Sequence, residues 1–278
     1  MWTRRRMLQT SAAALAGSPL FGKRSNLRIG VTDWNLQLTG QVEAVETAAK
    51  LGFEGVEVSL GRKSMDGKLP LDNADLQQRY LAAVQAHHIA LAGTCLDILH
   101  VNYLKNDKLG QKWVADAIPI TKKLNARVVL LPFFGKGALQ TTAEMDYVGD
   151  ALKDLVKDAE KAGVLLGLEN TISAEDNARI LDRVGSKALK VYYDVGNSTE
   201  GGFDVLKEIP WLGADRICQF HLKDRGYLGE GKIDFPAVMN RIMSLGFAGF
   251  ANLETNSPSK VIADDMQRNL GFIRKLMA

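Results

Sequence analysis

Four side chains with metal-binding groups close four successive apolar segments in the C-terminal half of the chain. Glu169 ends the segment VLLGLE, Asp194 ends KVYYD, His221 ends CQFH and Glu254 ends FANLE. Three carboxylates that meet in a closed site need a compensating positive charge to stay ionised, and a divalent cation supplies it. The pattern therefore predicts a metal site made of Glu169, Asp194, His221 and Glu254.

Three oxygen ligands and one imidazole are compatible with several divalent cations. They suit Mn²⁺, Mg²⁺, Co²⁺ or Zn²⁺ and do not choose among them. Taken singly, each of the four residues is more often a loop carboxylate, a helix cap or a core histidine. The prediction of one bound divalent metal ion therefore depends on all four occurring in order on consecutive segments.

Eight short apolar segments must position these groups, and each is followed by a stretch with helical periodicity. The segments begin near Leu27, Phe53, Ile89, Ala126, Val164, Leu189, Ile217 and Phe247. Several are nearly continuous runs of Val, Ile and Leu, which is typical of strands buried on both faces of a parallel sheet.

Amphipathic segments lie between these strands, among them residues 41–51, 76–88, 142–162 and 259–277. Gly52, Gly163 and Gly246 each stand just before a strand, where a glycine would end a helix.

Repeated strand–helix units without a linker predict one α/β domain, a single (β/α)8 TIM barrel over residues 27–278. An open doubly wound sheet is the main alternative. It would need a glycine-rich phosphate turn after its first strand, and Thr32-Asp33-Trp34-Asn35 is not one. In a barrel, the C-terminal ends of the strands form the mouth, so the four metal-binding groups would meet there.

The composition, with 46% hydrophobic and 24% charged residues, is that of an ordinary soluble globular protein. The formal net charge of +3 comes from residues 1–26, which hold no acid and five basic residues, and without these five the charge is −2. The body of the chain therefore does not indicate nucleic acid or an anionic membrane as a partner. Cys95 and Cys218 lie in expected strands far apart in the barrel, so we expect two buried thiols.

Residues 1–26 predict an export signal followed by a short linker. A twin-arginine pattern at 3–8 precedes an apolar run of small residues at 11–20, and Ala14-Leu15-Ala16 predicts cleavage after Ala16. The apolar run is too short to span a bilayer, so we expect no stable membrane anchor. The predicted location is periplasmic or otherwise exported, with the twin-arginine export machinery as a partner. The alternative is a disordered basic tail with an apolar patch.

Six short motifs occur in order along residues 27–278 and together resemble the sugar phosphate isomerase/epimerase superfamily, the xylose-isomerase-like barrels. They are LGFEGVE at 51–57, LEN at 168–170, YDVGN at 193–197, HLKD at 221–224, GEGKIDF at 229–235 and LE at 253–254. The ligand pattern is most similar to the tagatose epimerase branch. In that branch the metal ligands match Glu169, Asp194, His221 and Glu254, and the paired acid/base glutamates match Glu169 and Glu254.

The resemblance implies a divalent-metal-dependent isomerase or epimerase of an unphosphorylated sugar, keto-sugar or cyclitol, acting through a metal-stabilised enediolate. Two carboxylates on opposite faces of that planar intermediate would remove a proton from one face and return one to the other. The expectation of an unphosphorylated substrate depends on the predicted export and on the lack of an obvious arginine clamp at the mouth. A lyase of the same family, for 3-keto-glycoside cleavage or inosose dehydration, needs the same four ligands and remains an alternative. A non-catalytic sugar-binding barrel is a third hypothesis.

Five further residues are candidates for contact with a carbohydrate substrate: Asn197, Lys223, His100, Glu57 and Trp34. Asn197 stands where the similar epimerases carry a histidine, and an asparagine can bind a hydroxyl but cannot shuttle a proton. Lys223 shares strand parity with His221 and would point inward at a substrate oxygen, with a solvated loop lysine as an equal alternative. Glu57 ends the second strand, where a structural hydrogen bond inside the barrel is an equal alternative. His100 and Trp34 follow the third and first strands, and for both the alternative is local packing.

Two further expectations concern the rest of the chain. Asp234 precedes Phe235-Pro236, a pattern that predicts a helix N-cap. The chain has only four histidines, too few for the histidine-rich zinc site of the DNA-repair members of the superfamily, so we expect no nucleic acid partner. A homo-oligomer is compatible with the sequence.

Overall fold

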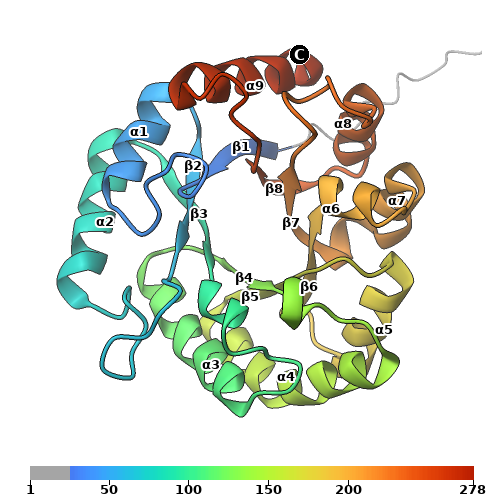
Figure 1. Ribbon diagram of the computed structural model, residues 1–278. Helices are drawn as coiled ribbons and strands as arrows, with labels where there is room; N and C mark the ends of the chain where they lie inside the picture. The colour runs from blue at the N-terminus through green and yellow to red at the C-terminus, as the bar shows by residue number, and fades with distance from the viewer. Residues whose placement is uncertain (1–25) are drawn as a thin grey trace, which may run out of the picture.

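The computed structural model describes residues 26–278, and within them eight parallel strands close into a barrel (Figure 1). The strands are β1 Asn26–Thr32, β2 Gly55–Ser59, β3 Ala90–Cys95, β4 Val128–Pro132, β5 Leu165–Glu169, β6 Leu189–Asp194, β7 Ile217–Leu222 and β8 Ala248–Leu253. Each strand pairs with the next, and β8 pairs with β1 in a register that runs from Asn26 opposite Ala248 to Val31 opposite Leu253. The predicted single (β/α)8 TIM barrel is confirmed.

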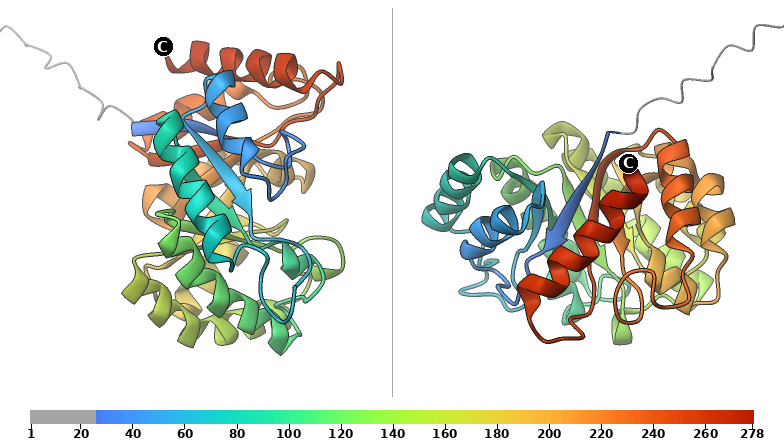
Figure 2. Two further views of the ribbon diagram at one scale, coloured as in Figure 1. Left: turned by 90° about the vertical axis from the view of Figure 1, so that its left-hand side faces the viewer. Right: turned by 90° about the horizontal axis from the view of Figure 1, so that it is seen from above.

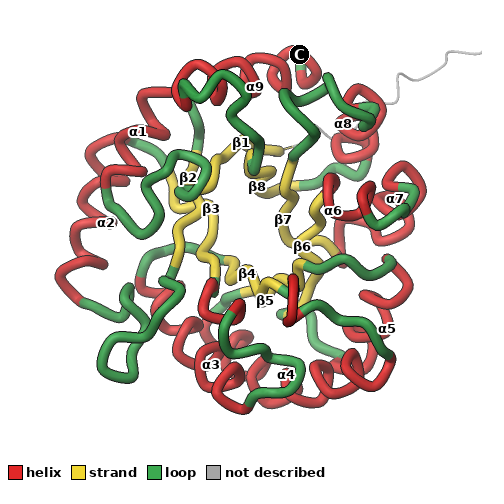
Figure 3. Tube along the Cα trace, in the orientation of Figure 1, coloured by secondary structure: helices red, strands yellow, loops and turns green. Residues whose placement is uncertain are grey.

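Helices form a ring around this barrel (Figure 3). They are α1 Glu43–Leu51, α2 Ala74–His87, α3 Lys108–Lys123, α4 Thr142–Ala162, α5 Ala174–Val184, α6 Val195–Glu200, α7 Val205–Arg216, α8 Phe235–Ser244 and α9 Ile262–Met277, with short 3₁₀ turns η1 Asp97–His100 and η2 Gly135–Gly137. The last helix, α9, contacts both α1 and α8 and so completes the ring, as the perpendicular views in Figure 2 show.

Local sequence signals set several helix ends. Thr141 and Glu144 form a capping box at the start of α4, and Gly163 ends that helix in the left-handed conformation with φ 70°. Asp234 caps α8 as predicted, because its side chain accepts a hydrogen bond from the backbone N–H of Ala237. Helix α9 begins at Ile262, three residues later than predicted, since Lys260 adopts a positive φ of 65° that interrupts a helix.

A polar layer lies inside the barrel below its mouth. The Tyr192 hydroxyl donates to Glu57 Oε2 at 2.7 Å, and Asn252 Nδ2 lies 3.1 Å from Gln219 Oε1. Gly30 on β1 leaves room for this layer, because a Cβ at that position would lie 2.0 Å from Asn252 Oδ1. The layer therefore forms a buried polar floor beneath the groups at the mouth.

Some of the remaining sequence predictions concern residues before Asn26, and others concern the described residues 26–278. Strand β1 begins at Asn26, one residue before the predicted start of the domain, and the export signal with its cleavage after Ala16 lies outside the described residues. Within residues 26–278, no helix has the length and apolar character needed to cross a membrane. Cys95 and Cys218 are both buried and unbridged, as predicted.

Candidate metal centre

The last four strands bring Glu169, Asp194, His221 and Glu254 to one end of the barrel. Glu169 and Asp194 are the final residues of β5 and β6, His221 lies one residue before the end of β7, and Glu254 directly follows β8. The strands are parallel and in register, with Asp194 opposite His221, so their C-terminal ends coincide. One potential ligand atom from each of the four residues lies within 4.8 Å of the others.

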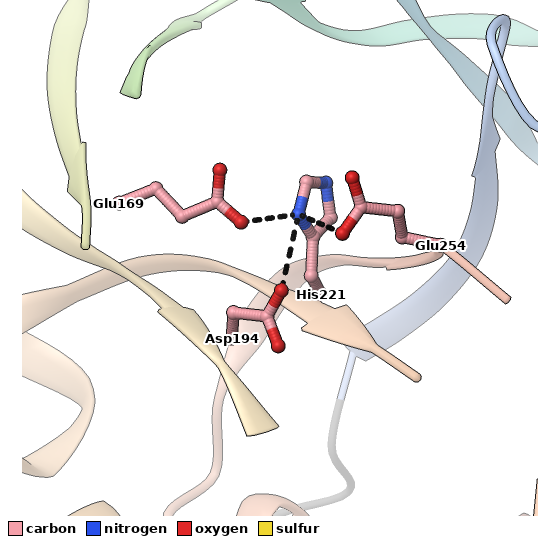
Figure 4. Close-up of side chains that lie close together, drawn as sticks. All are labelled: Glu169, Asp194, His221 and Glu254. Carbon is pink, nitrogen blue, oxygen red and sulfur yellow. Dashed lines mark hydrogen bonds and ion pairs between the residues drawn. The ribbon is translucent and has the colours of Figure 1, made fainter. Parts of the chain in front are cut away.

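The imidazole of His221 stands at the centre of this cluster. Its Nδ1 lies 2.9 Å from Glu169 Oε1, 3.6 Å from Glu254 Oε2 and 3.9 Å from Asp194 Oδ2. Figure 4 shows the two glutamates approaching the ring from opposite sides and the aspartate approaching from a third. The three carboxylates therefore converge on the single ring nitrogen that faces the mouth.

The Asp194 carboxylate has two functions, because its two oxygens face different partners. Oδ1 accepts a hydrogen bond from the backbone N–H of Asn197 at 2.8 Å and caps α6. Oδ2 is turned toward His221 and lies 2.8 Å from Lys223 Nζ. The YDVGN motif thus fixes the carboxylate by starting a helix directly after the strand.

Lys223 and Trp34 hold the Glu254 carboxylate. Lys223 Nζ lies 2.7 Å from Glu254 Oε2, and Trp34 Nε1 donates to Glu254 Oε1 at 2.9 Å. Lys223 therefore points inward, toward the mouth, as strand parity with His221 predicts. Each oxygen of Glu254 has a donor of its own, so the position of this carboxylate is well defined.

The pKa values in the cluster reflect crowded negative charge. Burial raises the pKa of Asp194; the Lys223 ammonium offsets part of that rise, and Glu169 and Glu254 add to it. Burial alone would lower the pKa of His221, but Glu169 and Glu254 outweigh it and raise that pKa well above its ordinary value. Burial acts to raise the pKa of Glu254, but the positive charges of His221 and Lys223 have the larger combined effect and lower it. This carboxylate is therefore ionised at neutral pH.

The donor set fits a divalent cation. Glu57, Glu169, Asp194 and Glu254 bring four carboxylates to the cluster, whereas His221 and Lys223 offer at most two positive charges. With all four carboxylates ionised, two negative charges would be left in a region where three of the four proposed ligands are at most 3% exposed, and the raised pKa of Asp194 reflects this excess. A buried excess of that size is costly unless a cation compensates it, so this end of the barrel is suited to binding one.

A cavity of about 800 Å³ opens directly over this cluster. Glu169, Lys223, Glu254 and Trp34 form one part of its wall, together with Asn197. His100 also lines this cavity, and its ring stacks on Phe134 with the centroids 6.2 Å apart. Four of the five predicted substrate-contacting residues therefore line the cavity.

Glu57 is the exception, because it lies beneath His221 and does not line the cavity. Its Oε2 lies 2.9 Å from His221 Nε2 and also accepts hydrogen bonds from the Tyr192 hydroxyl and Asn252 Nδ2. The structure favours the alternative interpretation, a hydrogen bond inside the barrel. A carboxylate on Nε2 keeps a proton on that nitrogen and leaves Nδ1 free to bind a metal.

Several lining residues were not identified from the sequence, among them the polar residues Ser59, Arg62 and Asp97. The Ser59 hydroxyl donates to Asp97 Oδ2 at 2.5 Å, and burial raises the pKa of Asp97 above its ordinary value. Asp97 lies two residues after the end of β3, where it begins the turn η1, so its place near the C-terminal end of a strand resembles the signal that identified the metal cluster. Arg62 is an exposed residue between β2 and α2, and it is the one arginine in this wall, where the sequence led us to expect no arginine clamp.

Comparisons with known proteins agree with this architecture. The model of the family described as xylose isomerase-like TIM barrel matches residues 45–276. A 2-epi-5-epi-valiolone 7-phosphate 2-epimerase from Actinoplanes sp. is 27% identical over 205 residues, which cover 71% of this chain and 72% of the relative.

Two solved structures illustrate the shared fold. An L-ribulose 3-epimerase aligns with a TM-score of 0.75 at 19% identity, over 90% of this chain and 94% of the other. A 3-keto-D-glucoside 4-epimerase from E. coli aligns with a TM-score of 0.71 at 16% identity, over 90% of this chain and 99% of the other.

Proposed function

This chain belongs to the xylose isomerase-like TIM barrel family, and on that basis we propose that it is a divalent-metal-dependent isomerase or epimerase of an unphosphorylated sugar, keto-sugar or cyclitol. The observation that carries the proposal is the convergence of Glu169, Asp194 and Glu254 on His221 Nδ1 at the floor of the large cavity. The epimerase from Actinoplanes sp. and the two epimerases of similar fold support the reaction class.

A cation held by these four residues would polarise the substrate carbonyl and stabilise the negative charge that develops when the neighbouring carbon loses its proton. The protein supplies the two groups that move the proton. Glu169 and Glu254 face each other across His221, so a substrate carbon between them presents one face to each carboxylate (Figure 4). One carboxylate removes a proton, and the other returns one to the opposite face of the same carbon or to its neighbour.

The surrounding residues prepare Glu254 for the role of base. Lys223 and Trp34 hydrogen-bond to its two oxygens, and the lowered pKa keeps it ionised at neutral pH. Asn197 lines the cavity beside Lys223 and can bind a substrate hydroxyl through its amide.

Hydrogen–deuterium exchange tests this proposal directly. The Mn²⁺-loaded protein is mixed with a panel of keto-sugars in heavy water, and exchange at the carbon beside the carbonyl is followed by NMR. We expect exchange without loss of a group from the substrate, and at least about 100-fold slower exchange in Glu254→Gln. Glu46→Gln, an exposed glutamate on α1, is the matched control and should exchange normally. The absence of exchange with every keto-sugar and every metal would refute the proposal.

One observation favours the lyase as a second candidate. Asp97 lines the same cavity as Glu169 and Glu254, and burial raises the pKa of its carboxyl above the ordinary value, so Asp97 is the candidate proton donor to a leaving group. In that case the reaction would release an alcohol or water, and Asp97→Asn would slow release while leaving deuterium exchange intact. If Asp97→Asn releases the group as fast as the wild type does and exchanges deuterium at the same rate, this role for Asp97 is excluded.

We also propose that the protein is exported through the twin-arginine machinery, which supports the choice of an unphosphorylated substrate because sugar phosphates stay in the cytoplasm. The pattern at residues 3–8 carries this proposal. Sequencing the exported protein should find Gly17 as the first residue, and replacing Arg4 and Arg5 with lysine should stop export. Export that persists in this double variant would contradict the proposal.

A further inference from the structure

A second cavity of about 390 Å³ adjoins the cavity over the metal cluster. It lies among the segments that follow β6, β7 and β8, and the proposed reaction gives no role to most of its wall. The two cavities share Asn197 and Lys223 as lining residues. A ligand that occupied the first cavity could therefore extend past Lys223 into the second.

The wall of this second cavity is held in a defined conformation. Asp224, only 8% exposed, accepts hydrogen bonds from the backbone N–H groups of Arg225 at 2.8 Å, Gly229 at 3.3 Å and Gly231 at 3.1 Å. A Cβ at Gly231 would lie 1.8 Å from Asp224 Oδ1, so only glycine allows this close approach. The GEGKIDF motif thus folds against Asp224 and presents Lys232 to the cavity.

The lining offers both hydrogen-bond donors and acceptors. Lys232 contributes an ammonium, Asn197 and Asn256 contribute side-chain amides, and Glu200 contributes a carboxylate. Within residues 26–278, neither of these amides has a hydrogen-bond partner from the protein, so both are available to a ligand. Mixed donors and acceptors of this kind match hydroxyl groups, which donate and accept at the same atom.

The charges argue for a neutral ligand. Arg225 Nε lies 3.4 Å from Glu200 Oε1, and Lys223 is bound to Asp194 and Glu254, so two of the three cations are already paired. Among the described residues, Lys232 is then the lining cation without an ion-pair partner, and a single ammonium offers a phosphate only one of the charged donors that it needs. The lining therefore favours a polyhydroxyl group over an anion.

We propose that the second cavity binds a further polyhydroxyl ring of the substrate, so that the substrate is a keto-sugar joined to another sugar or polyol residue. This inference rests on the proposed function, because the reacting ring must occupy the cavity over the metal cluster. Each cavity on its own falls within the range of about 300–1,000 Å³ that is usual for small-molecule sites.

Two matched substrates test the proposal: a 3-keto-hexose, and the same keto-hexose with a glucose joined by a glycosidic bond. Exchange in heavy water gives kcat/KM for each. We expect the disaccharide to be preferred by about tenfold, and Lys232→Met and Asn256→Ala each to lower that preference about five-fold, as loss of one hydrogen bond would. Lys157→Met, an exposed lysine on α4, is the control and should keep the preference. An unchanged preference in both cavity variants would overturn the proposal.

Binding measurements separate this proposal from the proposed reaction. The affinity of the unreactive parent disaccharide is measured by calorimetry for the metal-loaded protein and for the two cavity variants. Weaker binding in both variants supports the site for a second ring, whether or not any keto-sugar undergoes deuterium exchange. If binding weakens but no keto-sugar exchanges, only the proposed reaction is wrong. Binding that does not respond to either substitution, or inorganic phosphate that competes with the disaccharide and depends on Lys232, would overturn the proposal.

Discussion

Replacing Glu57 with Gln should weaken metal binding although Glu57 is not one of the four proposed ligands. Its Oε2 lies 2.9 Å from His221 Nε2, on the side of the ring away from the cavity, and the residue is fully buried. The carboxylate keeps the proton on Nε2 and increases the electron density that Nδ1 offers to a cation. Glutamine preserves the shape of the side chain but removes its charge.

The structure allows the size of this effect to be bounded. Loss of a group that orients a metal-binding histidine costs about 10- to 100-fold in metal affinity, or about 1.4 to 2.7 kcal/mol. We expect the upper part of that range, because the Glu57 and His221 side chains are both fully buried. Titration with Mn²⁺, followed by calorimetry or by the electron paramagnetic resonance signal of the free ion, measures the change.

The same substitution should not destabilise the metal-free protein by a comparable amount. Glu57 Oε1 is buried and has no hydrogen-bond partner among the described residues, so the carboxylate already carries an uncompensated desolvation cost. Glu54→Gln is the matched control: it lies three residues earlier, is exposed, and its carboxylate accepts a hydrogen bond from the backbone N–H of Ile29 at 2.9 Å. If Glu57→Gln binds Mn²⁺ as tightly as the wild type, the reasoning about His221 is refuted.

Three further predictions concern stability. Burial raises the pKa of Asp33 from 3.8 to about 7, so folding favours its protonated form. The free energy of unfolding should therefore fall by about 4 kcal/mol as the pH rises from about 4 to 7. Chemical denaturation at several pH values should show a smaller fall in Asp33→Asn, and an equal dependence on pH in both proteins would contradict this prediction. Gly30→Ala should lower stability by about 1–3 kcal/mol, because the new Cβ meets Asn252 Oδ1, and an unchanged thermal midpoint would argue against that contact. Mn²⁺ at 100 times its dissociation constant should stabilise the protein by about 2.7 kcal/mol and raise its melting temperature by roughly 5–10 °C, reversibly with a chelator; no shift would mean that the folded state does not bind the ion.

Sequence periodicity was sufficient to predict the barrel and the convergence at its mouth. Strand-then-helix units permit few architectures, and parallel closure places the C-terminal end of every strand on one face. The position of Glu169, Asp194, His221 and Glu254 relative to their strands therefore determined that they would meet. The one boundary that shifted notably, at α9, depends on the positive φ of Lys260, which no periodic pattern contains.

Contacts across the barrel could not be predicted in the same way. The partners of Glu57 are Tyr192, His221 and Asn252, residues 135 to 195 positions away, and only the closed barrel brings them together. The bridge that Lys223 makes between two carboxylates likewise depends on side-chain direction. The cavity wall at Asp97 depends on a 3₁₀ turn of four residues, which is too short to leave a periodic signal.

We propose that one divalent cation binds between the last four strands of the barrel. Anomalous diffraction from crystals grown with Mn²⁺ tests it most directly. We predict a single strong peak bounded by Glu169, Asp194, His221 Nδ1 and Glu254, at about 2.0–2.3 Å from each ligand atom. A peak elsewhere in the chain would contradict the proposed site. The absence of any peak, with Lys223 Nζ still bound to Asp194 and Glu254, would contradict it as well.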